Sequence, residues 1–550
     1  MALRVSRKIY REILNKRVFS TPLLTARHCS SSAQTAPNIP HSAKKGRLLT
    51  GATIGLVIAG GAYVSTVDDA TFCGWLFSAT KLLNPFFALL DPEVAHRLAV
   101  SAAAHGWIPR EKRPDPSNIG LEVWGRKFSN PIGLAAGFDK NAEAVDGLLG
   151  LGFGFVEVGS VTPVPQEGNP KPRIFRLPEG AIINRCGFNG EGIVAVAKRL
   201  DAQHAKRKLV ETSRNSSSST DEAKHRGKAG PGILGVNLGK NKTSEDAAAD
   251  YVQGVHTLSQ YADYLVINVS SPNTPGLRML QGRKQLEDLV KKVQAARDEM
   301  QWGKEGPPPL LVKIAPDLSK EDLEDIAAVA LALCLDGLVS SLPSLLQSFA
   351  CFPKYPWKRK PTSFLSKYSN SLVERDGQES ERYVPEHNRH AEHEAQRRDL
   401  KELNPRLNRL HRTPMLEEYH AATSPIVKNL LIISNTTVSR PDSVSKNPVA
   451  REVGGLSGKP LFNLSTNILK EMYVLTKGKI PLIGCGGVSS GGDAYQKIRA
   501  GATLVQLYTA FGYGGPALIP QIKRCFSRFL VGEIESLEIE ELGCKLCARL

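Results

Sequence analysis

Eight short apolar runs, each ending in small or polar residues, constrain the fold of this chain more than any other feature. Stretches with helical periodicity separate them, and one such stretch opens with Ser319 and Asp322 at the spacing of a capping box. Apolar strands that alternate with helices predict a parallel sheet. Eight such units predict a closed (β/α)8 TIM barrel, here over residues 118–535. The runs are PIGLAAGFDK (131–140), GFVEVGSVT (154–162), GILGVNLGKNK (232–242), YLVINVSSPN (264–273), LLVKIAPD (310–317), LLIISNTT (430–437), IPLIGCGGVSS (480–490) and TLVQLYTA (503–510).

The polar ends of these runs predict where the barrel carries its site. The stretch ADYLVINVSSPNTPG (262–276) changes from apolar residues to asparagines, serines and a threonine. Taken alone, such a stretch indicates a turn. In a barrel, however, the carboxyl ends of the strands meet around one pocket, so we expect the polar ends to form its wall.

A glycine-rich stretch, GCGGVSSGGD (484–493), follows the seventh run. Glycines let backbone N–H groups approach an anion closely, and TIM barrels often bind phosphate after strands seven and eight. We therefore expect a phosphate group there. No GxGxxG motif follows the first run, so a Rossmann dinucleotide domain is not supported.

The N-terminus predicts a targeting signal and a membrane anchor. Residues 1–36 are rich in Arg, Ser and Thr with Glu12 as their only acid, which is typical of a mitochondrial transit peptide. A secretory signal peptide is the alternative, which the long basic prefix disfavours. Residues 48–67 carry no charge and are long enough for one transmembrane helix. Basic residues precede it and acids follow, so the positive-inside rule puts the remaining chain in the intermembrane space, tethered to inner-membrane lipid.

Residues 72–109, at the centre of a region spanning 70–110, predict two short amphipathic helices rich in aromatic residues and leucine. They fit either a lid on the main domain or a helix pair lying in the membrane interface. The two interpretations are compatible if the helix pair forms an apolar entrance to an internal site.

The net charge of +17 does not indicate a nucleic-acid partner. Residues 1–47 hold ten Lys or Arg and one acid, and residues 351–428 hold fifteen Lys or Arg and eleven acids. The rest of the chain has no basic patch interleaved with aromatics. The nine cysteines lack disulfide spacing, which favours a reducing compartment, and the lone pair Cys544 and Cys547 predicts no metal site.

Several motifs of the chain are long and specific. They are NPIGLAAGFDKN, EVGSVTPVPQEGNPKPRIFRLPE, GVNLGKNK, NVSSPNTPGLR, VKIAPDL, SNTTVSRP, GGLSGKPL, GCGGVSSG and VQLYTA. Together they resemble the dihydroorotate dehydrogenase family, in its membrane-bound, quinone-using, mitochondrial class. The resemblance covers about residues 85–338 and 430–535. It implies oxidation of (S)-dihydroorotate to orotate in de novo pyrimidine (UMP) synthesis, with FMN as hydride acceptor and ubiquinone reoxidising the flavin.

The resemblance also implies roles for particular residues. The soluble class places Cys where this chain has Ser271, and the serine of the membrane class is the base, with Thr274 and Phe188 shaping the proton path. A serine is a poor base at its ordinary pKa and needs help from its neighbours. Lys140 would meet the substrate carboxylate as a compact cation. Paired amide donors and acceptors suit a planar ring, and the matching positions are Asn184, Asn268, Asn273, Asn435 and Thr436.

For the cofactor and the quinone, the implied residues form a second set. Lys313 would place positive charge near the flavin edge that becomes anionic on reduction. In two places the chain departs from the family: Cys186 replaces an expected aromatic residue, and Phe87 replaces a residue that is often polar. The matching FMN positions are Ala135, Ala136, Gly137, Ser160, Asn237, Asn268, Lys313, Ser434, Gly458, Gly486, Gly487, Tyr508 and Thr509, and His96 and Arg176 match the quinone tunnel.

The largest departure is an insert, residues 340–429, that interrupts the predicted sixth strand. It is polar, charged and aperiodic, which predicts disorder. Either it loops out at the amino end of the strand, with 430–433 rebuilding the strand, or it is a translated intron or gene-prediction error absent from the working protein. Tryptic peptides from 360–420 in the native protein would exclude the second explanation.

Two other functions fit parts of this pattern. An inactive, membrane-held scaffold is possible if the insert spoils the barrel, and a flavin spectrum bleached by dihydroorotate would eliminate it. Another FMN barrel acting on dihydropyrimidines is the other alternative. Lys140 favours dihydroorotate, because a lysine suits the carboxylate that simple dihydropyrimidines lack.

Overall fold

The computed structural model describes residues 67–214, 232–303, 306–335 and 429–532. The predicted transit peptide, the anchor up to residue 66, nearly all of the insert and the C-terminal CxxC motif lie outside the described residues. So does most of the polar stretch around residue 220.

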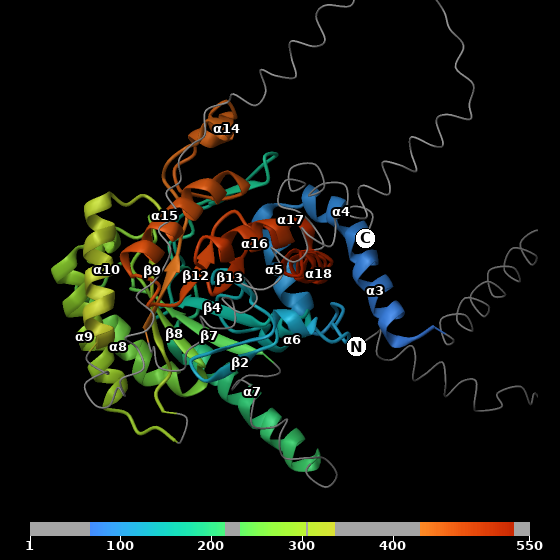
Figure 1. The fold of residues 1–550 in the computed structure, drawn as a ribbon, viewed down its shortest axis with the longest axis horizontal. Coiled ribbons are helices and arrows are strands. Elements are labelled where there is room, and N and C mark those ends of the chain that lie inside the picture. The colour runs from blue at the N-terminus through green and yellow to red at the C-terminus, as the bar shows by residue number, and fades with distance from the viewer. Residues whose placement is uncertain (1–66, 215–231, 304–305, 336–428, 533–550) are drawn as a thin grey trace, which may run out of the picture. The chain divides into compact units, whose positions relative to one another are not determined.

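Eight parallel strands close into a barrel in the order β10-β12-β13-β3-β4-β7-β8-β9, and a helix follows each strand (Figure 1). This confirms the predicted barrel, and every strand overlaps one of the eight predicted runs. The strands are β3 Ile132–Leu134, β4 Phe155–Val161, β7 Ile233–Leu238, β8 Tyr264–Asn268, β9 Leu310–Ile314, β10 Asn429–Ile433, β12 Leu482–Cys485 and β13 Leu504–Leu507. The helices that follow them are α6 Val145–Gly150, α7 Gly192–Arg214, α8 Ala247–Leu258, α9 Arg283–Asp298, α10 Lys320–Leu335, α15 Phe462–Leu475, α16 Gly491–Arg499 and, after the short α17 Thr509–Gly514, α18 Leu518–Leu530.

Local sequence signals set the helix starts. The predicted capping box forms at α10, where Asp322 N donates to Ser319 Oγ at 3.1 Å and Ser319 N donates to Asp322 Oδ2 at 3.0 Å. Asp246 caps α8 and Ser490 caps α16 in the same general way. Each cap satisfies N–H groups that have no partner within the helix.

Two aromatic rings fill the amino end of the barrel. Phe155 and Tyr264 are fully buried, and glycines on neighbouring strands make room for them. A Cβ at Gly133 would lie 2.3 Å from Phe155 Cζ, and one at Gly235 would lie 2.1 Å from Tyr264 Cζ. Both glycines are therefore required by the close approach of a ring.

A short hairpin, β1 Leu121–Val123 and β2 Arg126–Phe128, packs against these rings. Phe128 meets Phe155 edge to face with ring centroids 5.8 Å apart. Arg126 pairs with the fully buried Asp263, just before β8, at 2.9 Å. The amino end of the barrel is thus closed, and only the carboxyl end is left to hold a ligand.

Apart from Asn429, the last residue of the predicted insert, the sixth barrel strand is built from residues that follow the insert. Residues 429–433 of β10 pair with 310–314 of β9, and 431–433 pair with 482–484 of β12. The undescribed segment therefore connects α10 to the amino end of β10. One explanation of the insert expects 430–433 to rebuild the strand, and β10 contains these residues.

A further small sheet covers part of the barrel mouth. It contains β5 Ile174–Leu177, β6 Ala181–Asn184 and β11 Gly455–Gly458, in the order β11-β6-β5 and antiparallel throughout. The short helices α14 Asp442–Ser445 and η7 Pro448–Arg451 lead into β11.

The N-terminal region forms three helices and a 3₁₀ turn, where the sequence pattern predicted two helices. These are α3 Asp69–Thr80, η1 Lys81–Leu83, α4 Asn84–Leu89 and α5 Pro92–Ala104. Asp91 caps α5 by accepting from Glu93 N and Val94 N, with Pro92 at the first turn. Helix α5 then packs on α6, where a Cβ at Gly147 would lie 2.1 Å from the carbonyl oxygen of Ala103.

Among the described residues, none of the helices combines the length and the apolar character needed to cross a bilayer. Most of the predicted anchor, 48–67, precedes these residues.

An ion pair joins α5 to the barrel mouth and predicts a pH dependence. Arg173 donates to Glu93 at 2.8 and 3.1 Å, and these bonds, assisted by Lys171, lower the pKa of Glu93 to about 2. A carboxyl group whose pKa is lower in the folded state stabilises that state at pH values above its ordinary pKa of 4.5. This stabilisation is lost as the pH falls toward the folded-state pKa of about 2. We expect E93Q to be less stable than wild type by about 1–2 kcal/mol at pH 7 and by a shrinking amount between pH 4.5 and 2.

Urea unfolding at several pH values measures this difference. The matched control is E287Q, which removes the exposed pair between Glu287 and Lys291 on α9. A difference between wild type and E93Q that stayed constant down to the lowest pH would show that the ion pair is not its source.

Candidate active site

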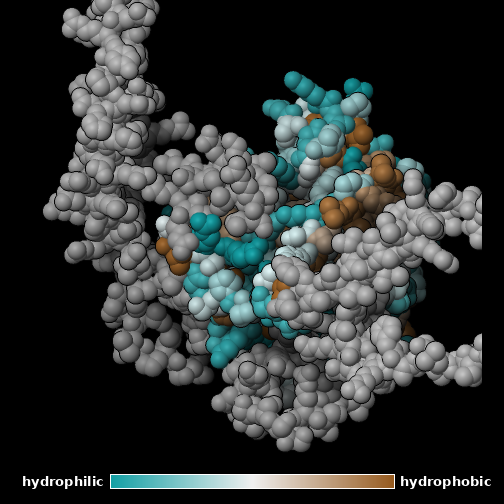
Figure 2. All heavy atoms as spheres, turned by 90° about the vertical axis from the view of Figure 1, so that its right-hand side faces the viewer, coloured by the Kyte–Doolittle hydropathy of each residue, from teal (hydrophilic) through white to brown (hydrophobic). Residues whose placement is uncertain are grey.

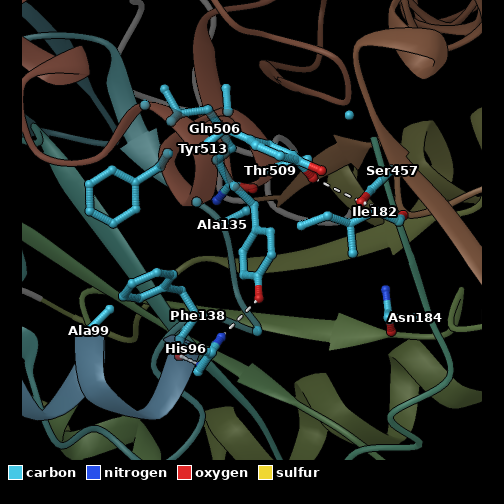
Figure 3. Close-up of a pocket in the computed structure, with 18 of the residues that line it drawn as sticks. His96, Ala99, Ala135, Phe138, Ile182, Asn184, Ser457, Gln506, Thr509 and Tyr513 are labelled. Carbon is cyan, nitrogen blue, oxygen red and sulfur yellow. Dashed lines mark hydrogen bonds between the residues drawn. The ribbon is translucent and has the colours of Figure 1, made fainter. Parts of the chain in front are cut away.

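A cavity of about 790 Å³ lies at the carboxyl end of the barrel and continues to helices α3, α4 and α5. Residues at the ends of every barrel strand except β7 line it, together with residues of β5, β6 and β11. One wall is the polar tip of the barrel, and the other is the apolar inner side of the N-terminal helices. Figure 3 shows His96 and Ala99 of α5 at one side of this cavity and Asn184 at the other.

The cavity brings together nearly all the residues that the sequence singled out. Asn237 and Thr274 are the exceptions: both are buried close by without lining the cavity. The lining residues from the prediction are Ala135, Ala136, Gly137, Lys140, Ser160, Asn184, Phe188, Asn268, Ser271, Asn273, Lys313, Ser434, Asn435, Thr436, Gly458, Gly486, Gly487, Tyr508 and Thr509, with His96 and Arg176 from the predicted tunnel.

Amide side chains from different strands form a connected cluster at the tip of β8. Asn435 Nδ2 donates to Asn268 Oδ1 at 3.3 Å and to Ser270 Oγ at 3.0 Å. Asn273 Nδ2 donates to the carbonyl oxygen of Asn184 at 3.2 Å. The cluster offers fixed donors and acceptors, which suits a planar ligand with amide edges.

A buried charged network lies directly beneath this cluster. Glu157, on β4, has no exposure and accepts from Asn237 Nδ2 at 2.8 Å and from Gln506 Nε2 at 2.7 Å. Lys313 Nζ lies 3.8 Å from Glu157 Oε1. The network connects upward, because Ser160 Oγ donates to Asn237 Oδ1 and accepts from Asn268 Nδ2.

The loop that carries the predicted base, Ser271, is largely shielded from solvent. Ser271 is 7% exposed, lines the cavity, and its Oγ accepts from Asn273 N at 3.3 Å. Thr274 is buried, and its Oγ1 has no hydrogen-bond partner among the described residues. Phe188 has a positive φ of 54° and packs its ring close to Gly239.

Among the described residues, three cations of the cavity wall lack a counter-charge: Lys140, the exposed Lys459, and Arg176, whose donors go to backbone carbonyls. Lys140 has no hydrogen bond or ion pair within the part of the chain that the structure describes, and it lines the cavity. Its neighbour His96 is strongly affected: burial and the Lys140 charge lower the pKa of His96 to about 3. An uncompensated ammonium in a cavity is suited to bind an anion.

His96 is therefore a neutral imidazole of known tautomer. Its Nε2 lies 2.8 Å from the carbonyl oxygen of Phe138, so Nε2 carries the proton and donates. Nδ1 then accepts from the hydroxyl of Tyr508 at 3.3 Å, and burial raises the pKa of that hydroxyl. Figure 3 shows this contact at the boundary between the barrel tip and α5.

The glycine-rich loop after β12 rests on a buried lysine. Lys497 Nζ donates to Ser465 Oγ at 2.6 Å, and Ser465 Oγ donates to the carbonyl oxygen of Gly486 at 3.0 Å. Burial lowers the pKa of Lys497 to about 7. The loop residues Gly486 and Gly487 line the cavity next to Thr509, at the start of α17.

The far end of the cavity is apolar. Phe87 and other residues of α4 line it, and Arg176 of β5 donates to the carbonyl oxygens of Ala88 and Leu90 at 3.1 and 2.8 Å. Figure 2 shows hydrophobic side chains gathered on this side of the molecule. The exposed large ones in these helices are Trp75, Leu82, Leu83, Phe86, Leu89, Val94 and Leu98.

The sequence prediction missed two residues of the cavity floor. Glu157 is the only charged residue in the run FVEVGSV, and Gln506 is the only polar residue in the run LVQL. That isolation was the available signal, because a charge or amide in a buried strand needs a buried partner. It gives no information about which strands supply the partners.

Comparisons with known proteins agree with this geometry. The family model described as "Dihydroorotate dehydrogenase" matches residues 119–360 and 403–530. The Arabidopsis thaliana protein "Dihydroorotate dehydrogenase (quinone), mitochondrial" is 66% identical over 530 residues. The aligned region covers 95% of this chain and 95% of that protein. The Mus musculus protein of the same name is 43% identical over 462 residues, covering 84% of this chain and 87% of its own.

A solved structure is also similar. The crystal structure of DHODH from Eimeria tenella in complex with ferulenol matches with a TM-score of 0.58 and 34% identity, covering 80% of this chain and 92% of that chain. Sequence and structure thus agree along most of the barrel, and the chain belongs to the dihydroorotate dehydrogenase family.

Proposed function

We propose that this protein oxidises (S)-dihydroorotate to orotate, with FMN as hydride acceptor and ubiquinone as final electron acceptor, in de novo pyrimidine synthesis. Family membership supports the reaction. The observation that carries the substrate assignment is the uncompensated Lys140 ammonium in the same cavity as the amide cluster of Asn268, Asn273 and Asn435. A planar ring with amide edges and a carboxylate fits both features.

The residues present fit an FMN group. Gln506 Oε1 is buried, lines the cavity and has no hydrogen-bond partner among the described residues. Gly137 has a φ of +103° and faces open space, with its nearest neighbour, Tyr508 Cε2, 3.8 Å from the position of a Cβ. A flat ring could therefore approach this backbone. Bound FMN would supply the hydride acceptor.

The holding residues divide by chemistry. Ala135, Ala136 and Gly137 offer backbone, while Ser160, Asn237, Asn268, Lys313 and Ser434 offer polar groups near the floor. The loop at Gly486 and Gly487, with Gly458, Tyr508 and Thr509, would hold the phosphate. The Lys497 contact through Ser465 supports this, because it fixes the backbone of the loop from below.

The chain's own part of the reaction is proton removal. Ser271 would take the proton from the substrate carbon, and the amide cluster would fix the ring so that this carbon faces the serine. Enclosure supports the role, because excluding water strengthens the hydrogen bonds that assist a weak base. The hydroxyl of Thr274, which has no hydrogen-bond partner among the described residues, would pass the proton on, and Phe188 would shape its path.

The apolar end of the cavity would admit ubiquinone between α4 and α5. The exposed apolar side chains of these helices support contact with lipid, as an interfacial helix pair would make. His96 and Arg176 lie along this path. We place the protein at the mitochondrial inner membrane, with 1–36 as transit peptide, 48–67 as its single transmembrane helix and the catalytic domain in the intermembrane space.

The segment 340–429 remains a proposed insert. The family model leaves 361–402 unmatched, and β10 takes only Asn429 from the segment. The barrel therefore forms although the sequence contains the segment, and this argues against the inactive scaffold.

Anaerobic mixing of the purified protein with dihydroorotate tests the function. We expect the oxidised flavin absorbance to bleach on mixing and to return when a ubiquinone analogue is added. Protein that carries flavin but is not bleached by dihydroorotate would overturn the proposed reaction. Bleaching by a dihydropyrimidine that lacks the carboxylate, with equal rate, would favour the other FMN barrel.

Ser271→Ala separates the two half-reactions. We expect flavin reduction by dihydroorotate to slow by about 100-fold or more, because the proton acceptor is lost. Reoxidation by quinone should keep its wild-type rate, since no substrate proton moves in that step. S443A, an exposed serine of α14 that does not line the cavity, is the control. Equal slowing of both half-reactions would remove Ser271 as the base.

Lys140→Ala tests the anion partner. We expect dihydroorotate to bind about 10- to 100-fold more weakly, because a charged contact to the carboxylate is lost. Because the cationic neighbour also disappears, the pKa of His96 should rise. Measurement of the substrate dependence of flavin reduction gives the first quantity, and NMR titration of the imidazole gives the second. Unchanged binding would show that the carboxylate lies elsewhere.

A further inference from the structure

Arg278 contacts three consecutive strand tips of the barrel. Its Nε donates to the carbonyl oxygen of Ser270 after β8, at 3.1 Å. Its Nη1 donates to Asp317 Oδ2 after β9 at 3.0 Å, and its Nη2 donates to the carbonyl oxygen of Thr436 after β10 at 3.1 Å. Every nitrogen of the guanidinium therefore holds a different loop.

Asp317 reinforces the third of these loops. Its carboxylate accepts from Val438 N at 3.0 Å, from Ser439 Oγ at 3.1 Å and from Thr437 Oγ1. The side chains of Asp317 and Arg278 are 13% and 25% exposed, so water competes little for these bonds. The pair fixes the backbone from 436 to 439 at several points.

Neither residue lines the cavity, yet the loops they hold carry proposed substrate residues. Ser270 directly precedes Ser271, and Thr436 directly follows Asn435. We propose that Arg278 and Asp317 form a positioning pair, which sets the distance between the base at Ser271 and the ring-binding groups Asn435 and Thr436. This inference rests on the proposed function and gives roles to two residues that lie in the quoted motifs but have no role assigned to them above.

The geometry requires arginine. A guanidinium presents donors in a rigid plane that reaches three acceptors in different directions, whereas a lysine ammonium is a single point on a flexible stem. The side-chain contacts across the cavity do not replace it. Asn435 reaches Asn268 and Ser270 with its amide, but neither of those bonds holds the carbonyl oxygen of Ser270, which Arg278 does.

Arg278→Met tests the proposal in the holoenzyme. We expect flavin reduction by dihydroorotate to slow by about tenfold or more, because small displacements of reacting groups have large effects on rate. Dihydroorotate should also bind more weakly, while flavin content and reoxidation by a ubiquinone analogue stay at wild-type values. R278K should behave like R278M, since a lysine cannot hold all three loops.

Two controls separate positioning from general damage. R283M removes an exposed arginine paired with Asp325 at 3.4 Å and should leave both half-reactions unchanged. Methylguanidinium added to R278A should restore part of the reduction rate, because it can refill the site of the side chain. A merely structural role would instead lower the melting temperature and both half-reactions together, without rescue.

The outcomes are distinguishable from failure of the proposed function. If dihydroorotate does not bleach wild-type flavin, the function itself is wrong. If dihydroorotate bleaches the wild-type flavin, and the flavin of R278M is reduced at the wild-type rate with the wild-type dependence on substrate concentration, the positioning pair is refuted. D317N gives an independent check: it should weaken the same half-reaction, and the double variant with R278M should be little worse than either alone.

Discussion

The buried carboxylate of Glu157 ties together the floor of the cavity, and the rest of the site depends on it. A charge without exposure is costly unless it is paired and hydrogen-bonded. Glu157 meets that requirement with side chains from four other strands: Asn237 of β7, Tyr264 of β8, Lys313 of β9 and Gln506 of β13. Each of these bonds also fixes the side chain that makes it. Asn237 then orients Ser160, and Ser160 orients Asn268, so the order of the floor extends to the amide cluster.

Much of the fold could be predicted because the signals are local. The apolar runs, the polar residues after them and the capping box of α10 all lie within a few residues of the elements they define. Most residues of the site could be named for a related reason: parallel strands in a barrel end at the same edge, so residues such as Asn268 and Asn435 must converge. The match of motifs to a known family supplied their chemical roles.

The remainder depends on contacts that no local pattern encodes. Glu157 and Gln506 are separated by more than three hundred residues and meet only because the barrel closes between β13 and β3. Arg278 is the last residue of the motif NVSSPNTPGLR, and only the register of three neighbouring strands gives it three acceptors. The sequence pattern predicts two N-terminal helices where the structure has three, because the 3₁₀ turn at 81–83 divides an apolar stretch. Pro85, at the start of α4, is the local signal of that break.

The two ends of the cavity differ in polarity, and His96 lies where they meet. A charged imidazole there would face the Lys140 ammonium in a buried setting, and the two positive charges would repel each other. Burial keeps His96 neutral, so it can join α5 to Phe138 and Tyr508 by hydrogen bonds without adding charge. Lys140 then remains without a counter-charge among the described residues, so an anion in the cavity can pair with it. The apolar end, where the charge of Arg176 is taken up by two backbone carbonyls, offers nothing comparable to an anion. One continuous cavity can in this way bind an anionic ring at its polar end and an apolar acceptor at its apolar end, because each end disfavours the other ligand.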